Sequence, residues 1–211
     1  MEVPLAVGPQ LDLALPASVS LSDWIGETLG DSLGARGELN DRERIAMGML
    51  SIALDHREAV LLLVSKGARS SAMALMRPIF ESLVSGYWMT ACATDQQAQA
   101  FMAERHAPSL DTLIRKLQKH DAVGALFGHI KRLHGTLLHD FVHGGPRQVS
   151  RWISPAEIGP RHSDLEMVEV LRVVDVLGLF ACVVREDLTG RDSQPFLVRL
   201  QAMLEPGNPS Q

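Results

Sequence analysis

The sequence is poor in the residues on which disulfide-rich and all-β proteins depend. It has two cysteines, one tyrosine and an aromatic content of 5% in 211 residues. Cys92 and Cys182 both lie in apolar helical patterns, which is typical of reduced thiols in a core rather than of a disulfide framework. Because strands are enriched in aromatic residues, the low aromatic content and the many Ala, Leu and Met residues favour helices instead.

No run of apolar residues is long enough to span a membrane. A span needs about 18 or more such residues, whereas the longest candidate, 173–184, is interrupted by Asp175. The first residues also lack the basic stretch followed by an apolar one that marks a secretory signal. We therefore expect a cytoplasmic protein of bacterial type with no membrane partner.

Several common sequence motifs are missing as well. There is no G-x-x-x-x-G-K-[ST] loop, no G-x-G-x-x-G after a strand, no C-x-x-C pair and no nucleophile elbow around a serine. These absences exclude the usual phosphate-loop, dinucleotide-binding and thiol-redox sites, and no cofactor is expected.

Helical periodicity is present instead along most of the chain. Apolar spacing and capping residues predict helices over 20–29, 40–67, 69–93, 95–106, 109–120, 163–189 and 195–204, and another from 123 or 128 to 143. No segment predicts a strand, and 147–160 is expected to be an ordered loop or lid. The fold class is therefore all-α, a single-domain bundle of four to five main helices. We expect an N-terminal arm with a short helix over 1–37, the bundle over 38–205 and a disordered tail over 206–211.

One predicted helix carries a polar stripe. At about 100° per residue, Arg132, Thr136, His139 and His143 fall within roughly 60° of one another. An arginine beside a neutral histidine can bind a phosphodiester and exchange protons with a ribose 2′-OH or a leaving oxygen. The same stripe is also what the solvated face of an amphipathic helix looks like, so both interpretations remain open.

His139 and His143 also have the H-x-x-x-H spacing with which two imidazoles bind one Zn²⁺. A third ligand would have to come from Asp140, Glu81 or His106. The glutamate of H-E-x-x-H is missing, since Asp140 follows His139. A divalent metal at this pair is therefore a secondary hypothesis.

A second constellation lies on the helix predicted over 69–93, where Arg77 and Glu81 are four residues apart among mostly apolar positions. Buried or half-buried ions are retained when they are paired or used. Glu81 can therefore satisfy Arg77 in a structural pair, or it can orient His139 or His143 while Arg77 holds an anion.

Charge is unevenly distributed, although the net charge is only −5. The segment 105–151 holds eight Lys or Arg against three acidic residues, so it carries +5, and it contains six of the eight histidines. A basic region beside the polar stripe suits an anionic ligand such as RNA or a nucleotide.

The elements Arg77-Pro-Ile-Phe-Glu81 and Leu138-His139-Asp-Phe-Val-His143-Gly-Gly resemble those of uncharacterised bacterial all-helical families with R-x-x-x-E and H-x-x-x-H-G-G elements. These families are distantly similar to HEPN domains, the higher-eukaryote and prokaryote nucleotide-binding domains. The HEPN motif is an arginine, four to six residues and a histidine, which Arg132 and His139 match, although Leu133 stands where a polar residue is common.

This resemblance implies a HEPN-like bundle, commonly dimeric, and a metal-independent ribonuclease of a toxin or defence system that has an antitoxin or another protein as partner. The residues then implied as catalytic are Arg132, His139 and Glu81, with Arg77 and His143 binding the ligand. The alternative is a non-catalytic binding or interaction module in which the same Arg, Glu and His residues form a structural polar network.

Overall fold

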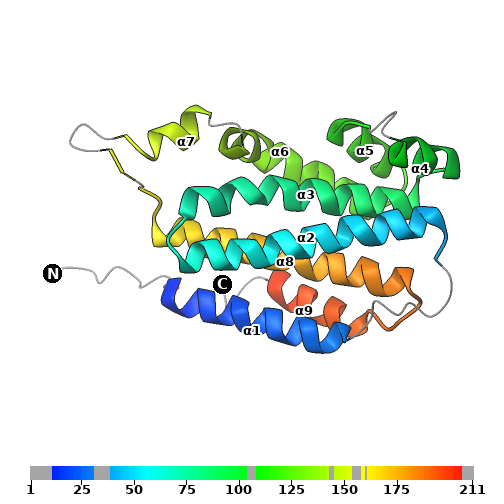
Figure 1. Cartoon of the computed structure of the whole chain (residues 1–211), viewed down its shortest axis with the longest axis horizontal. Coiled ribbons are helices and arrows are strands. Elements are labelled where there is room, and N and C mark those ends of the chain that lie inside the picture. Colours follow the sequence, from blue (N-terminus) through cyan, green and yellow to red (C-terminus); the bar gives the residue numbers. More distant parts are fainter. Residues whose placement is uncertain are drawn as a thin grey trace.

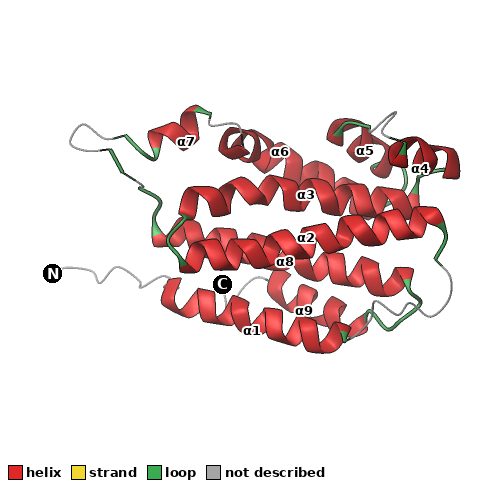
Figure 2. Ribbon diagram, in the orientation of Figure 1, coloured by secondary structure: helices red, strands yellow, loops and turns green. Residues whose placement is uncertain are grey.

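The computed structural model describes residues 11–30, 39–103, 108–142, 145–153, 158–159 and 161–205, with the side chains at 133, 134, 136–141 and 147 outside this description. These residues form helices and no strand, apart from an isolated antiparallel bridge between Ile153 and Ile158. The expected all-α class is confirmed (Figure 2). The helices are α1 (Leu11–Leu29), α2 (Asp41–Ser65), α3 (Arg69–Ala91), α4 (Asp95–Met102), α5 (Leu110–Leu117), α6 (Ala122–Val142), α7 (Pro146–Ser150), α8 (Asp164–Leu188) and α9 (Gln194–Leu204).

The hairpin of α2 and α3 is the centre of the bundle (Figure 1). Helix α8 packs against both of its members, α6 and α5 pack on the side of α3, and α1 and α9 pack on α8. The main core lies between α2, α3 and α8, where Leu50, Ile79, Phe80, Leu83 and Val174 are almost fully buried. A smaller cluster joins α8 to α1 and α9.

Capping residues set several helix ends as expected. Asn40 and Ser163 each form a capping box, with Glu43 and Glu166 as the reciprocal partners. Gly67 follows α2 with φ of +72°, a left-handed conformation that favours glycine and ends the helix. The N-cap of α4 is Thr94, whose hydroxyl oxygen accepts from the Gln97 amide.

Two segments differ from their expected structures. Helix α1 begins at Leu11, nine residues earlier than expected. It contains Pro16 and packs on α8. Residues 146–150, expected as part of a loop, form the short helix α7, with Pro146 in its first turn. Pro146 costs no helical hydrogen bond in the first turn of α7, whereas Pro16 is the sixth residue of α1 and removes one, so α1 depends on its packing against α8.

A buried ion pair joins three helices. Arg57 of α2 is 0% exposed and donates from Nε and Nη2 to Oδ1 of Asp175 in α8, at 3.0 and 2.6 Å, and Asp175 is 5% exposed. Nη2 of Arg57 also donates to the Ser18 carbonyl of α1, and the Ser18 hydroxyl donates to Oδ2 of Asp175 at 2.6 Å. Gly178 leaves room for the stem of Arg57, since a Cβ there would lie 2.5 Å from its Cδ. The network fixes α1 on α2 and α8.

Glycine allows α6 to lie close to the end of α5. A Cβ added at Gly124 would lie 2.0 Å from the Leu117 carbonyl carbon, and one at Gly128 would lie 2.1 Å from Nε2 of Gln118. Gly124 and Gly128 are four residues apart, so both glycines face α5. The close packing of α6 on the end of α5 therefore requires that positions 124 and 128 carry no side chain.

The aromatic residues divide between core and surface. Because the sequence has few aromatic residues, it predicts core positions for Tyr87, Trp88 and Trp152. Tyr87 packs edge-to-face on Phe127 and Phe180, and Trp88 is buried, which confirms the prediction for both. Trp152 is 41% exposed, so its interpretation as a core residue is wrong.

The two cysteines behave as reduced core thiols. Cys182 is buried in α8 and Cys92 is half-buried after α3, and both are free. Burial raises the pKa of the Cys182 thiol to about 12, so the thiol is protonated at neutral pH.

Candidate functional site

A pocket of about 330 Å³ opens between α3, α5 and α6. It lies over the part of α3 that carries the R-x-x-x-E element and beside the basic helices α5 and α6. Its described lining consists of Arg77, Phe80, Ser109, Leu110, Asp111, Lys131 and Gly135. Arginine and lysine are the donors that proteins use for phosphate and carboxylate groups, so the pocket has the chemistry of an anion site.

Arg77 and Glu81 form the ion pair that their spacing predicts. Nε of Arg77 donates to Oε1 of Glu81 at 2.7 Å, and the side chains are 26% and 39% exposed. They are half-buried because the neighbouring positions Ile79 and Phe80 face the core. Among the described residues, the Nη groups of Arg77 have no hydrogen-bond partner. Glu81 therefore orients the guanidinium and leaves its outer donors to the pocket.

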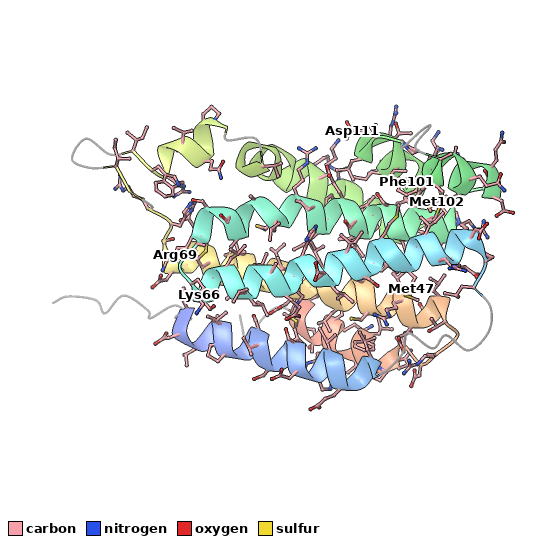
Figure 3. All side chains as sticks on the ribbon, in the orientation of Figure 1. Met47, Lys66, Arg69, Phe101, Met102 and Asp111 are labelled. Carbon is pink, nitrogen blue, oxygen red and sulfur yellow. The ribbon has the colours of Figure 1, made fainter. Side chains whose placement is uncertain are left out.

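Lys131 and Asp111 form the opposite wall of the pocket. The Nζ of Lys131 on α6 pairs with Oδ1 of Asp111 on α5, and Figure 3 shows Asp111 on the outer side of the bundle. Gly135 lies one turn after Lys131 and adds no side chain to this wall. The pocket thus contains two cations, Arg77 and Lys131, and one carboxylate, Asp111, while Glu81 holds Arg77 from outside the lining.

The polar stripe of α6 borders this wall. Arg132 is exposed and follows Lys131 directly. The backbone of His139 belongs to α6, one turn beyond Gly135, while its side chain lies outside the described part of the chain. His143 is also outside it. The structure thus pairs Arg77 with Glu81 on α3 and places Arg132 on the neighbouring helix α6. The expected contact of Glu81 with His139 or His143 involves side chains outside the described part of the chain.

The sequence did not single out three of the residues that line the pocket: Lys131, Asp111 and Ser109. Their only signal in the sequence was the basic segment 105–151, which contains all three. Ser109 acts first as the N-cap of α5, where its Oγ accepts from the Thr112 amide at 3.4 Å. The pairing of Lys131 with Asp111 joins residues twenty positions apart, and no local pattern predicts such a contact.

A second polar cluster lies at the start of α3. Nε1 of Trp152 donates to the Ser70 hydroxyl oxygen at 2.9 Å, and that oxygen lies 2.9 Å from Nε2 of His162. Arg69 donates to the His162 carbonyl and, at 2.6 Å, to Asp164. Figure 3 shows Arg69 where α2 turns into α3, next to the chain that enters α8. The cluster attaches the segment between α7 and α8 to the central hairpin.

His162 is neutral in this cluster. Burial lowers the pKa of His162 below its usual 6.5, and the charges of Arg151 and Arg69 act in the same direction, against Glu166. A neutral imidazole can accept the Ser70 proton at Nε2, which matches the donation from Trp152 to the same hydroxyl oxygen.

Replacement of His162 by glutamine is expected to reduce the loss of stability in acid. A histidine with a lowered folded pKa contributes stability that is present above pH 6.5 and is lost as the pH falls through 6.5 toward the folded value. Glutamine can still accept from Ser70 but does not titrate. Thermal unfolding from pH 7.5 to 5 should show a smaller fall in Tm for His162→Gln than for the wild type, whereas equal falls would contradict this role.

No group of three or more His, Cys, Asp or Glu side chains among the described residues could hold a metal ion. His106 and His143 of the zinc hypothesis lie outside that part of the chain, so the hypothesis remains untested. None of the described helices is long and apolar enough to cross a membrane.

Comparison with known proteins assigns the family. The family model described as Family of unknown function (DUF6988) matches residues 50–201. The match covers more than half of the chain, from the middle of α2 to α9, and the chain belongs to this family. No curated protein and no solved structure matches the chain.

Proposed function

We propose that this chain is a HEPN-like protein that binds RNA in the pocket between α3, α5 and α6 and cleaves it without a metal. The observation that supports the proposal most is the geometry of Arg77. Its guanidinium is held by Glu81 at 2.7 Å at the wall of a pocket that also contains Lys131. A pre-oriented arginine loses little conformational entropy when it binds a phosphate.

The charge around the pocket favours a phosphate-bearing chain over a single small anion. The carboxylates of Glu81 and Asp111 offset the charges of the two pocket cations. A single phosphate in the pocket therefore gains little net electrostatic attraction. Arg132 is exposed on α6, and Arg115 is exposed on α5, one turn beyond Asp111 of the pocket. An RNA strand contacts several such cations at once, and its affinity comes from their sum.

Cleavage in this proposal uses the histidine of the polar stripe. His139, as a neutral imidazole, takes the proton of a ribose 2′-OH, and the 2′-oxygen attacks the adjacent phosphorus. The 5′-oxygen of the next nucleotide leaves and takes up a proton, so the products are a 2′,3′-cyclic phosphate and a 5′-OH. Arg132 stabilises the added negative charge on the phosphate, and Glu81 orients Arg77, with His143 as a further ligand of the RNA.

The biological setting follows from the resemblance to HEPN domains. A homodimer would place two α6 stripes along one composite cleft, and an antitoxin or another protein partner would restrain the nuclease. The protein would act in the cytoplasm, where RNA is available.

A second candidate function is supported by the same ion pairs. Both cations of the pocket already have carboxylate partners, which is what a structural polar network in a non-catalytic interaction module requires. The two functions differ in whether Arg77 contributes to RNA affinity.

Replacement of Arg77 by glutamine is expected to weaken RNA binding by about tenfold, since a hydrogen bond to a charged group contributes about 1.5–3 kcal/mol. The slope of log K against log[salt] should also become less steep by about 0.7, the share of one phosphate contact in a single strand. Fluorescence anisotropy with a 2′-O-methyl RNA oligonucleotide, which lacks the attacking hydroxyl, measures both quantities without cleavage.

Arg199→Gln is the matched control for this change. It removes the same charge from α9, where Arg199 stacks over Trp24 at 4.4 Å, away from the pocket. We expect wild-type RNA affinity for the control. Equal affinities and equal salt slopes for all three proteins would contradict the RNA site and favour the interaction module.

A further inference from the structure

An apolar groove runs along the opposite side of α6 from the basic pocket. It has a volume of about 240 Å³ and lies between α6 and α9, above α3 and α8. Its floor contains Leu83 of α3 and Leu177 of α8, which are buried, and Phe180, which is half-buried. A concave site with an apolar floor and few polar groups is the usual form of a small-molecule site.

The walls of the groove are exposed where it opens. Leu126 on α6 is 45% exposed and Leu204 on α9 is 52% exposed, while Phe127 and Leu200 below them are buried. The apolar surface therefore continues from solvent to the core without a polar interruption. A ligand that fills the groove has to be apolar along most of its length, because the described lining offers few hydrogen bonds to a polar one.

Arg172 of α8 is the one charged residue in the described lining. Its side chain is 38% exposed, and within the described part of the chain its one ion pair is with Glu169, where Nη1 lies 3.9 Å from Oε2. At that distance no hydrogen bond forms, so the guanidinium keeps its planar donor pair. Such a pair matches a carboxylate in a bidentate arrangement.

We infer that this groove binds a single-chain fatty acid, with its alkyl chain on Leu83, Leu177 and Phe180 and its carboxylate on Arg172. The lining follows α8 from Arg172 to Phe180, which is about 12 Å at a rise of about 1.5 Å per residue. A chain of about eight to ten carbons is therefore the expected length. This site is separate from the proposed RNA site, although α6 forms a wall of both.

The lone cation and the apolar floor also argue against other ligands. A phosphate monoester carries nearly two negative charges and is usually bound by several cations, whereas one arginine balances one carboxylate. Glu169 lies on the same side of α8 and repels an anion, so its removal should strengthen binding rather than weaken it.

Isothermal titration with decanoate, below the concentration at which it forms micelles, tests the proposal. We expect saturable binding of one decanoate per chain, about fourfold tighter for each added methylene from hexanoate to decanoate, which corresponds to about 0.8 kcal/mol per CH₂. Decanol should bind at least tenfold more weakly than decanoate, because it cannot pair with Arg172.

Three variants separate the parts of the site. Arg172→Gln should remove the preference for decanoate over decanol, and Glu169→Gln should raise the affinity for decanoate. Val173→Phe should block both ligands, since the larger ring fills the groove that Val173 lines. Circular dichroism checks that each variant is folded.

Other results would overturn the proposal. They are the absence of saturable binding to the wild type, an affinity that does not depend on chain length, and an unchanged preference for decanoate in Arg172→Gln. Binding that disappears as the protein is concentrated would show instead that a second copy of the chain covers the groove.

Discussion

Replacement of Asp175 by alanine is expected to lower the free energy of unfolding by about 3–5 kcal/mol, the usual cost of leaving one partner of a buried ion pair alone. Arg57 is 0% exposed and donates twice to this carboxylate, so it would lose its buried counter-ion and keep only the exposed carboxylate of Glu58, whose Oε1 lies 2.6 Å from its Nη1. The Ser18 hydroxyl loses its acceptor as well. Urea unfolding followed by circular dichroism measures the change.

The double variant Arg57→Met, Asp175→Leu is the control for this explanation. It removes both charges and keeps apolar volume, so we expect it to be clearly more stable than Asp175→Ala. The pair would then act by charge compensation rather than by shape. A double variant as unstable as Asp175→Ala would show that the hydrogen bonds to α1 carry the effect.

Replacement of Gly124 by alanine is expected to destabilise the protein by about 1–3 kcal/mol or more, the range for forcing extra atoms into a packed contact. The new Cβ would lie 2.0 Å from the backbone carbonyl carbon of Leu117, and backbone yields less readily than a side chain. Helices α5 and α6 must therefore separate, which also widens the pocket that they share with α3. Thermal unfolding gives the stability.

Gly48→Ala provides the matched comparison. Gly48 lies in α2 with nothing within 4 Å of an added Cβ, so the change should stabilise the protein by about 0.5–1 kcal/mol through helix propensity alone. A Gly124→Ala protein that gains stability as Gly48→Ala does would contradict the close approach of α5 and α6.

The helices could be predicted from the sequence because their signals are local. Helix ends can be recognised from three or four neighbouring residues, as at the N-caps Asn40 and Ser163 and at Gly67 after α2. Apolar periodicity then shows how far each helix extends. The Arg77–Glu81 pair belongs to the same class, since residues four apart meet on any helix. These predictions needed no knowledge of the tertiary structure.

The remaining features depend on residues that are distant in sequence. Asp175 was seen only as an interruption of an apolar run, whereas it meets Arg57 across the bundle. The pairing of Lys131 with Asp111 and the closure of α5 on Gly124 likewise require the packed fold. A stripe such as the one that begins at Arg132 shows which residues share a face, but not what the face contacts.

Cleavage of end-labelled RNA by the purified chain tests the proposed function most directly, with and without EDTA and beside a His139→Ala variant of matched Tm. We predict cleavage that resists EDTA and falls at least 100-fold in the variant, the usual contribution of a general acid or base. Cleavage that EDTA abolishes would contradict the metal-free mechanism and favour a metal at His139 and His143. Equal cleavage by the variant would exclude His139 from the mechanism, and no cleavage of any RNA would favour the non-catalytic module.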